Sequence, residues 1–271
     1  MKISLKSRHA LIGGSSKGLG YAVAKQLAYS GAKVTLVARS EDLLKKSIAE
    51  LNKSTDCKHE YIVCDYNDHE KYSKIIGDYL NKNRIDILVN NTQGPKAGDV
   101  NSLSINDYQK AFDLLFKNIV YTTMLALEKM KKNKWGRVIN MTSVSIKEPL
   151  SYLALSNSIR SSVISWAKTL SNDIGNNNIT VNNILTGFFD TERLKELNSE
   201  KAKKLNVEIS QLYDAMKQEV PLGRIGNPEE FGFLVTFLAS ENASYINGAN
   251  IPIDGGLLKS CLLYTSPSPR D

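Results

Sequence analysis

The sequence predicts an α/β fold in which helices cover both faces of a parallel β-sheet. Short apolar runs alternate with longer stretches of helical periodicity, and a glycine-rich turn joins the first run to the first such stretch. Alternating strands and helices favour right-handed crossovers, which make the strands parallel. The 271 residues, 42% of them hydrophobic, suffice for one large domain, which we place at residues 1–260.

The strands are predicted from β-branched and aliphatic runs bounded by turn residues. In chain order these runs are HALIGG (9–14), KVTLVA (33–38), EYIVCD (60–65), IDILVNN (85–91), GRVINMTS (136–143), ITVNNIL (179–185) and NIPIDGG (250–256). The helical stretches between them are roughly 18–30, 41–53, 67–82, 104–133, 153–175 and 227–240. The last helix has the clearest start, because Asn227 suits an N-cap and Pro228 suits the first helical position.

Residues 188–222 interrupt this alternation. They have a helical pattern but follow the carboxyl end of the sixth strand. Ligands of such sheets bind at the carboxyl ends of the strands. We interpret the segment as a mobile lid over a substrate; an ordinary surface helical hairpin is the alternative.

The last eleven residues, CLLYTSPSPRD, differ in character from the rest and follow DGGLLKS, which reads as the end of the folded part. The string resembles a translated sequencing adapter, and a short disordered Ser/Pro-rich terminus is the alternative. We therefore exclude residues 261–271 from the predicted domain as a non-native tail.

The composition narrows the range of functions. The formal charge is +7, but the lysines are scattered among acids and no basic block alternates with aromatic residues, so we expect no nucleic-acid partner. No apolar run reaches the length of a bilayer span and we find no secretory signal, so we expect no membrane association and a cytoplasmic location. The three cysteines lack metal-ligand spacing, so we expect no metal.

The glycine-rich turn IGGSSKGLG predicts a dinucleotide site. Its glycines lie between the first strand and the first helix, where they allow a tight turn and a close approach of the backbone to a pyrophosphate. The N-terminus of the following helix adds unpaired N–H groups and the positive end of its dipole. A purely structural turn is the alternative. The residues expected at the cofactor here are Gly14, Ser16, Lys17, Gly18, Leu19 and Gly20.

The residues after the second strand favour NADP(H) over NAD(H). An NAD site usually carries an acid there, whereas this chain has Arg39 followed by Ser40. With Lys17 in the glycine turn, two cations suit a 2′-phosphate, which arginine can bind in a bidentate manner. A solvated loop arginine is the alternative for Arg39. At the ends of the next two strands, Asp65 could accept a hydrogen bond from the adenine amino group, and Asn90 suits a structural role beside the cofactor.

These features resemble the short-chain dehydrogenase/reductase family over residues 8–258. The glycine turn, the NN pair (90–91), Ser143 and the segments LTGFFDTERL and RIGNPEEFGFLVTFLASENASYINGANIPIDGG carry the resemblance, which is close to 3-oxoacyl-[acyl-carrier-protein] reductase-like members. The resemblance implies a Rossmann-type sheet of seven strands in the order 3-2-1-4-5-6-7 and a homotetramer or homodimer. It also implies hydride exchange between NAD(P) and a small-molecule carbonyl or alcohol.

The catalytic positions depart from that family. Its members use a serine to orient the carbonyl, a Tyr-x-x-x-Lys pair to donate the proton and hold the ribose, and an asparagine to hold a relay water. The serine matches Ser143, but the tyrosine position is Ser156, the lysine position is Arg160 and the asparagine position is Leu115. A serine hydroxyl is a poor general acid, and arginine keeps its charge but cannot shuttle protons. Tyr152 and Lys147 are further candidates for a rebuilt site, although each suits an ordinary loop better.

The motifs NNTQGP (90–95) and LSNSIR (155–160) look like an atypical branch of reductase-like members that lacks the Tyr-x-x-x-Lys pair. After the sixth strand, Gly187 keeps the glycine of the family's Pro-Gly, and Thr191 matches the position that contacts the nicotinamide amide. Catalytic roles fall to Ser143, Ser156 and Arg160. Three hypotheses remain: an NADP(H)-dependent oxidoreductase of altered mechanism, a weak or inactive NADP(H)-binding sensor or scaffold, and an enzyme for dehydration or epimerisation.

Overall fold

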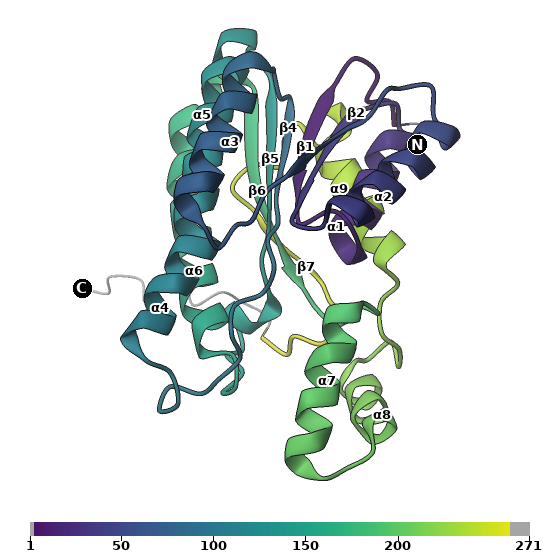
Figure 1. The fold of residues 1–271 in the computed structure, drawn as a ribbon, viewed down its shortest axis with the longest axis vertical. Helices are drawn as coiled ribbons and strands as arrows, with labels where there is room; N and C mark the ends of the chain where they lie inside the picture. Colours follow the sequence, from purple (N-terminus) through teal and green to yellow (C-terminus); the bar gives the residue numbers. More distant parts are fainter. Residues whose placement is uncertain (1–2, 261–271) are drawn as a thin grey trace, which may run out of the picture.

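The computed structural model describes residues 3–260; the predicted non-native tail at 261–271 lies outside the described residues. Its centre is a seven-stranded sheet in the order β3-β2-β1-β4-β5-β6-β7, with every neighbouring pair parallel. This confirms the predicted fold class and strand order (Figure 1).

The strands are short and buried where they cross the centre of the sheet, as their aliphatic sequences require. They are β1 (His9–Gly13), β2 (Lys33–Ala38), β3 (Glu60–Val63), β4 (Ile87–Asn90), β5 (Gly136–Met141), β6 (Ile179–Thr186) and β7 (Asn250–Ile253). The longer helices are α1 (Gly18–Tyr29), α2 (Glu41–Ser54), α3 (His69–Lys82), α4 (Ile105–Phe112), α5 (Asn118–Asn133), α6 (Ala154–Ile174), α7 (Glu192–Leu205), α8 (Ile209–Glu219) and α9 (Pro228–Leu238). Short 3-10 helices cover Val144–Ile146, Gly175–Asn177 and Glu241–Ala243.

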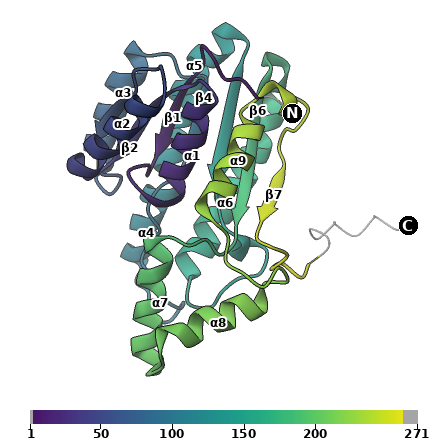
Figure 2. The same cartoon turned by 90° about the vertical axis from the view of Figure 1, so that its right-hand side faces the viewer.

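Two apolar cores lie on opposite faces of the sheet. One contains buried residues of α1, α2 and α9, and the other contains buried residues of α3, α5 and α6. Figures 1 and 2 show these two helical layers with the sheet between them. Because both faces are covered, the strands are apolar along their length rather than alternating.

The predicted helix at 104–133 is interrupted. A π-helix at Asp113–Lys117 separates α4 from α5, with the N–H of Asn118 donating to the carbonyl of Asp113. Helical periodicity in the sequence did not reveal it, because one wider turn leaves the apolar spacing on either side nearly unchanged. Leu115 lies inside this turn and is fully buried. Such wider turns are often found at functional sites.

The segment 188–222 contains α7 and α8, which lie beyond the carboxyl ends of the strands (Figures 1 and 2). The predicted N-cap of α9 is confirmed: the side chain of Asn227 accepts from the N–H of Glu229, in a capping box with Glu230. Among residues 3–260, no helix combines the length and the apolar character needed to span a bilayer.

A row of four asparagines crosses half of the sheet. Asn90, Asn140, Asn183 and Asn250 are partners in the register of neighbouring strands β4 to β7. The Nδ2 of each of the first three donates to the Oδ1 of the next at 2.8 Å. Asn90 also donates to Thr123 Oγ1 of α5 at 3.0 Å. These side-chain bonds tie the four neighbouring strands together in one register, and hydrogen bonds in such a chain polarise one another.

Candidate active site

The glycine turn has the backbone geometry that its sequence predicted. Gly14 and Gly18 have φ values of +54° and +60°, which favour glycine. A Cβ on Gly20 would lie 2.2 Å from the carbonyl oxygen of Gly14, so no side chain fits where α1 approaches the turn. The turn therefore presents main chain and the N-terminus of α1 to a ligand, which is the arrangement that binds phosphate.

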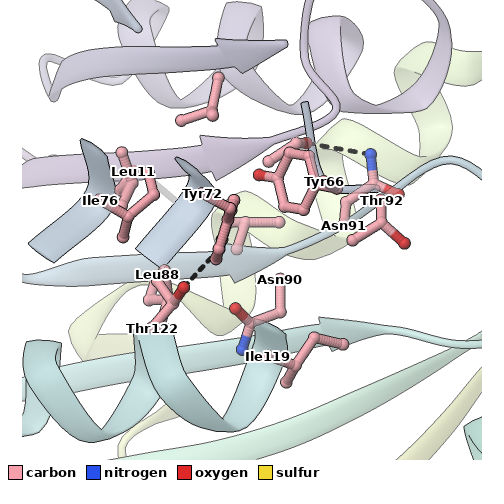
Figure 3. A pocket seen from close by; sticks show the side chains of 13 residues that line it. Leu11, Tyr66, Tyr72, Ile76, Leu88, Asn90, Asn91, Thr92, Ile119 and Thr122 are labelled. Atoms are coloured by element: carbon pink, nitrogen blue, oxygen red, sulfur yellow. Dashed lines mark hydrogen bonds between the residues drawn. The ribbon is translucent and has the colours of Figure 1, made fainter. Parts of the chain in front are cut away.

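Two residues outside the predicted set hold this turn. Ser15 is fully buried; its Oγ donates to the Ile12 carbonyl at 2.7 Å and accepts from the Val37 N–H at 3.0 Å. Asn91 Nδ2 donates to the Gly13 carbonyl at 3.0 Å (Figure 3). It also donates to the Gly14 carbonyl at 3.2 Å. The NN pair at 90–91 was the signal that could have identified Asn91.

The remaining residues of the turn have different surroundings. The carbonyl of Ser16 accepts from Ser47 Oγ of α2 at 3.2 Å, which ties the turn to the neighbouring helix. Lys17 is exposed at the N-cap position of α1. Leu19 packs partly against the first core. Only Lys17 therefore offers a charged side chain at the mouth of the turn.

The end of β2 carries the residues predicted to select the cofactor. Arg39 is exposed, and no ion pair of its guanidinium is seen within residues 3–260. The Oγ of Ser40 accepts from the N–H of Leu43 at 3.4 Å and so caps α2. Its hydroxyl hydrogen is left for another acceptor, so a cation and a hydroxyl donor lie side by side at this edge.

The end of β3 places Asp65 at the surface beside a buried tyrosine pair. Asp65 Oδ1 accepts from both the main-chain and side-chain N–H groups of Asn67 at 2.9 Å, which leaves the other carboxylate oxygen for a ligand. Tyr66 is buried, and its ring lies 4.7 Å from that of Tyr72, whose hydroxyl bonds Thr122. Burial raises the pKa of both tyrosines, so they stay neutral.

A cavity of only about 10 Å³ lies among these side chains (Figure 3). Its lining includes Tyr66, Tyr72, Asn90 and Asn91. That volume is about the least that one water molecule needs. This space is therefore part of the packing behind the cofactor turn and has no room for a substrate.

Ser143 follows β5 and begins the short 3-10 helix Val144–Ile146. Its Oγ accepts from the N–H of Ser145 at 3.1 Å. This contact fixes the direction of the side chain and leaves the hydroxyl hydrogen available as a donor to a carbonyl oxygen. Lys147 lies at the C-cap of the same short helix.

Ser156 and Arg160 lie one turn apart on α6. Ser156 is 7% exposed, and Arg160 Nη1 donates to the carbonyl of Met141 at 2.6 Å. Burial alone lowers the pKa of the Arg160 guanidinium to about 10, so the group remains charged at neutral pH. A guanidinium carries five N–H donors, and this one is held at the end of β5, two residues before Ser143.

The other end of the site is formed by the segment after β6. The Gly187 N–H donates to the Ile253 carbonyl at 3.0 Å. Thr191 is the N-cap of α7, and its Cγ2 lies 3.8 Å from the position that a Cβ on Gly18 would take. The N-cap of α7 therefore lies against the glycine turn.

The ring of Tyr152 contacts the helix α7. It precedes α6 and is 39% exposed, and the Lys201 ammonium of α7 lies 5.4 Å from its ring centroid. Burial and the nearby Glu219 carboxylate raise the pKa of its hydroxyl. This direction is the opposite of what a proton donor near neutral pH requires.

Taken together, the glycine turn after β1 offers main-chain N–H groups, Lys17 and Arg39 add two exposed cations, and Ser143 after β5 offers a hydroxyl donor. Arg160 of α6 adds a partly buried cation at the end of β5. Such an arrangement can hold a phosphate-bearing dinucleotide and stabilise negative charge on a carbonyl oxygen. It lacks a side chain that readily releases a proton near neutral pH at the positions of Ser156 and Leu115.

The same chain was compared with known proteins. The model of the family described as enoyl-(acyl carrier protein) reductase matches residues 14–258. The 3-oxoacyl-[acyl-carrier-protein] reductase FabG of Aquifex aeolicus (strain VF5) is 30% identical over 259 residues, covering 95% of this chain and 100% of that protein. The NADPH-dependent reductase BacG of Bacillus subtilis (strain 168) is 30% identical over 261 residues, covering 94% of this chain and 100% of that protein.

Solved structures agree over the same length. The L-sorbose reductase of Gluconobacter frateurii, complexed with NADPH and L-sorbose, has a TM-score of 0.89 at 27% identity and covers 96% of this chain and 100% of its own. The structure of YwfH, an NADPH dependent reductase involved in bacilysin biosynthesis, has a TM-score of 0.88 at 27% identity and covers 93% of this chain and 99% of its own.

Proposed function

Because this chain belongs to the short-chain dehydrogenase/reductase family, we propose that it is an NADP(H)-dependent oxidoreductase acting on a carbonyl/alcohol pair. Substrates similar to 3-oxoacyl compounds are the first candidates, since several relatives carry that name. The observation that carries the proposal is Arg160. Its partly buried guanidinium is held against the Met141 carbonyl, two residues before Ser143 in the chain, where it can stabilise an oxyanion.

The cofactor site fits a nicotinamide dinucleotide with a 2′-phosphate. The positive φ values of Gly14 and Gly18 and the close approach of Gly20 to the Gly14 carbonyl keep the turn free of side chains, and Lys17 and Arg39 are exposed at its edge. Asp65 has a free carboxylate oxygen for an adenine amino group, and Thr191 lies over Gly18 at the nicotinamide end. When bound, NADP(H) supplies or accepts the hydride.

The residues of this chain would bind and polarise the substrate oxygen. Ser143 donates its hydroxyl hydrogen to that oxygen, and Arg160 stabilises the negative charge that develops on it. Ser156, one turn from Arg160, provides a second hydroxyl. The proton must come from water, directly or relayed by Ser156, since neither serine nor arginine releases one readily near neutral pH. Loss of a general acid costs roughly 10²–10⁴ in rate, so we expect slow turnover on simple carbonyls.

A non-catalytic NADP(H)-binding protein is the second candidate, and two residues favour it. Leu115 is fully buried where a relay asparagine would stand, and Ser156 replaces the proton donor. Both changes leave the glycine turn intact. This candidate predicts tight nucleotide binding without turnover.

The experiment that separates the two candidates combines calorimetry and kinetics on protein trimmed after Ser260. Binding of NADPH, NADP, NADH and NAD is measured, and a panel of 3-oxoacyl thioesters, keto sugars and simple ketones is tested with NADPH. Turnover above the rate without enzyme supports the oxidoreductase, and binding without turnover supports the sensor. The absence of nucleotide binding would contradict both.

Cofactor preference is tested by Arg39→Asp. We expect this change to weaken NADPH binding strongly and NADH binding little, because it removes the guanidinium proposed for the 2′-phosphate. Lys46→Asp is the matched control: it makes the same change of charge on the exposed surface of α2. Equal losses of NADPH affinity in the two variants would show that only the overall positive charge of this surface matters, and not a specific contact of Arg39.

A further inference from the structure

The lid, defined as α7 and α8, lies on two loops that are joined to each other. The Gly98 N–H donates to the Tyr152 carbonyl at 2.8 Å, and the Ala154 N–H donates to the Gly98 carbonyl at 3.2 Å. These bonds connect the loop after β4 to the loop before α6 in an isolated parallel bridge. The two loops therefore form one platform opposite α7.

Two cationic side chains of α7 contact this platform. Arg193 Nη2 donates to the Pro95 carbonyl at 3.4 Å, in the loop after β4. Lys201 places its ammonium 5.4 Å from the ring centroid of Tyr152, in the loop before α6. The Glu219 carboxylate, at the end of α8, adds to burial in raising the pKa of the Tyr152 hydroxyl. The loop before α6 is therefore held to α7 through the Tyr152 ring, and the loop after β4 through Pro95.

The contact at Tyr152 is distant from the cofactor end of the lid. Thr191, the N-cap of α7, lies against Gly18, and Lys201 is ten residues further along the helix. At 1.5 Å per residue, Lys201 is about 15 Å from Thr191. Tyr152 therefore lies under the outer part of α7 and not at the position where a hydride and a proton would be transferred.

We propose that Tyr152 is a positioning residue whose ring binds Lys201 and thereby latches α7 over the substrate, and that it is not the replacement proton donor. The attraction between an ammonium and an aromatic ring depends on the face of the ring and not on its hydroxyl. Phenylalanine at position 152 would therefore keep the latch, whereas alanine would remove it. The role in substrate retention rests on the proposed function, but the latch itself is measurable without turnover.

Hydrogen–deuterium exchange of residues 192–219, with and without NADPH, reports the latch directly. We expect Tyr152→Ala and Lys201→Met to speed exchange across α7 and α8 by about two- to five-fold, as the loss of an exposed cation–π contact implies. Tyr152→Phe should exchange like the unaltered protein. Lys203→Met is the matched control, because Lys203 is exposed on the same helix.

Kinetics on any substrate turned over by the unaltered protein provide the second measurement. Tyr152→Ala should raise KM by a similar factor with little change in the rate of hydride transfer in a single turnover, and Tyr152→Phe should restore KM. Loss of turnover in Tyr152→Phe with unchanged lid exchange would identify Tyr152 as the proton donor and overturn the proposal. Unchanged lid exchange in Tyr152→Ala would equally overturn it, whether or not the protein turns over a substrate.

Discussion

The two halves of the sheet build their parts of the site in different ways. Beside strands β1 to β3, the centre of the proposed cofactor site is main chain, at which Gly14, Gly18 and Gly20 are required by backbone geometry. The side chains of Lys17, Arg39 and Asp65 lie only at its edge. Strands β4 to β7 present side chains, and at Leu115, Ser156 and Arg160 these differ from the family's usual residues.

The difference shows which kind of site can change its chemistry through amino-acid substitutions alone. A main-chain site cannot change without moving the backbone, so its sequence pattern stays recognisable. A side-chain site can exchange its chemistry while the frame below it persists. In the second half that frame is the row of four uncharged asparagines, from Asn90 to Asn250, which ties strands β4 to β7 together independently of the residues at the site.

The chemistry of the second half is tested most directly at Arg160. Arg160→Gln removes the fixed charge from the end of β5, and we expect kcat/KM to fall on the order of 10²–10³, equivalent to about 3–4 kcal/mol. Steady-state kinetics with NADPH and the best substrate of the panel measure this. Lys168→Gln, an exposed lysine two turns further along α6, is the control. Equal activity in both variants would remove Arg160 from the site.

The frame of the second half is tested at Asn140. Asn140→Leu leaves the amide of Asn90 without one acceptor and the Oδ1 of Asn183 without its donor, both in buried positions. We expect the free energy of unfolding to fall by about 2–4 kcal/mol in denaturant titrations. Asn81→Leu, on the exposed surface of α3, should change it by less than about 0.5 kcal/mol. A similar small effect at Asn140 would mean that the row contributes no stability.

The main-chain site of the first half is tested at Gly20. Gly20→Ala would place a methyl group 2.2 Å from the Gly14 carbonyl, so the turn or α1 must move. We expect a loss of about 3 kcal/mol in unfolding free energy and roughly 100-fold weaker NADPH binding by calorimetry. Gly175→Ala is the control, since its Cβ would meet only a side-chain nitrogen at 3.3 Å. NADPH binding at full strength in Gly20→Ala would refute the main-chain account.

We expect the loss of stability in mild acid to arise beside strands β1 to β3. His9 bonds Thr35 at 2.8 Å, and burial and then Lys33 lower the pKa of His9 to about 4. Burial lowers the pKa of His59 as well. Because the unfolded chain binds these protons at about pH 6.5 and the folded protein does not, stability falls as pH falls from 6.5 towards 4.

Between pH 7 and pH 5, the lowered pKa of His9 accounts for a loss of about 2 kcal/mol in the free energy of unfolding. Denaturant unfolding at pH 7, 6 and 5 measures it, and His9→Gln should show a shallower slope because the contribution of His9 is then absent. The asparagine row does not titrate, so Asn140→Leu should keep the slope of the unaltered protein. If the free energy of unfolding depended on pH equally in His9→Gln and the unaltered protein, groups other than His9 would cause the loss of stability in acid.

The sequence by itself determined the features that depend on neighbours along the chain. The strands, most helices, the glycine turn and the N-cap at Asn227 each follow from a few consecutive residues whose stereochemistry allows one local structure. The π-helix at 113–117 is the local exception, because the segments on either side are each ordinary α-helix. The catalytic roles of Ser143, Ser156 and Arg160 stay predictions.

Only the tertiary structure decided which distant residues meet. Asn91 holds the turn at Gly13 and Gly14, more than seventy residues away, and the asparagine row joins positions on four strands. The contact of Lys201 with Tyr152 depends on where the lid lies. Such pairs form because strand register and helix packing bring their side chains together. The sequence between the two residues of a pair does not by itself show that they are in contact.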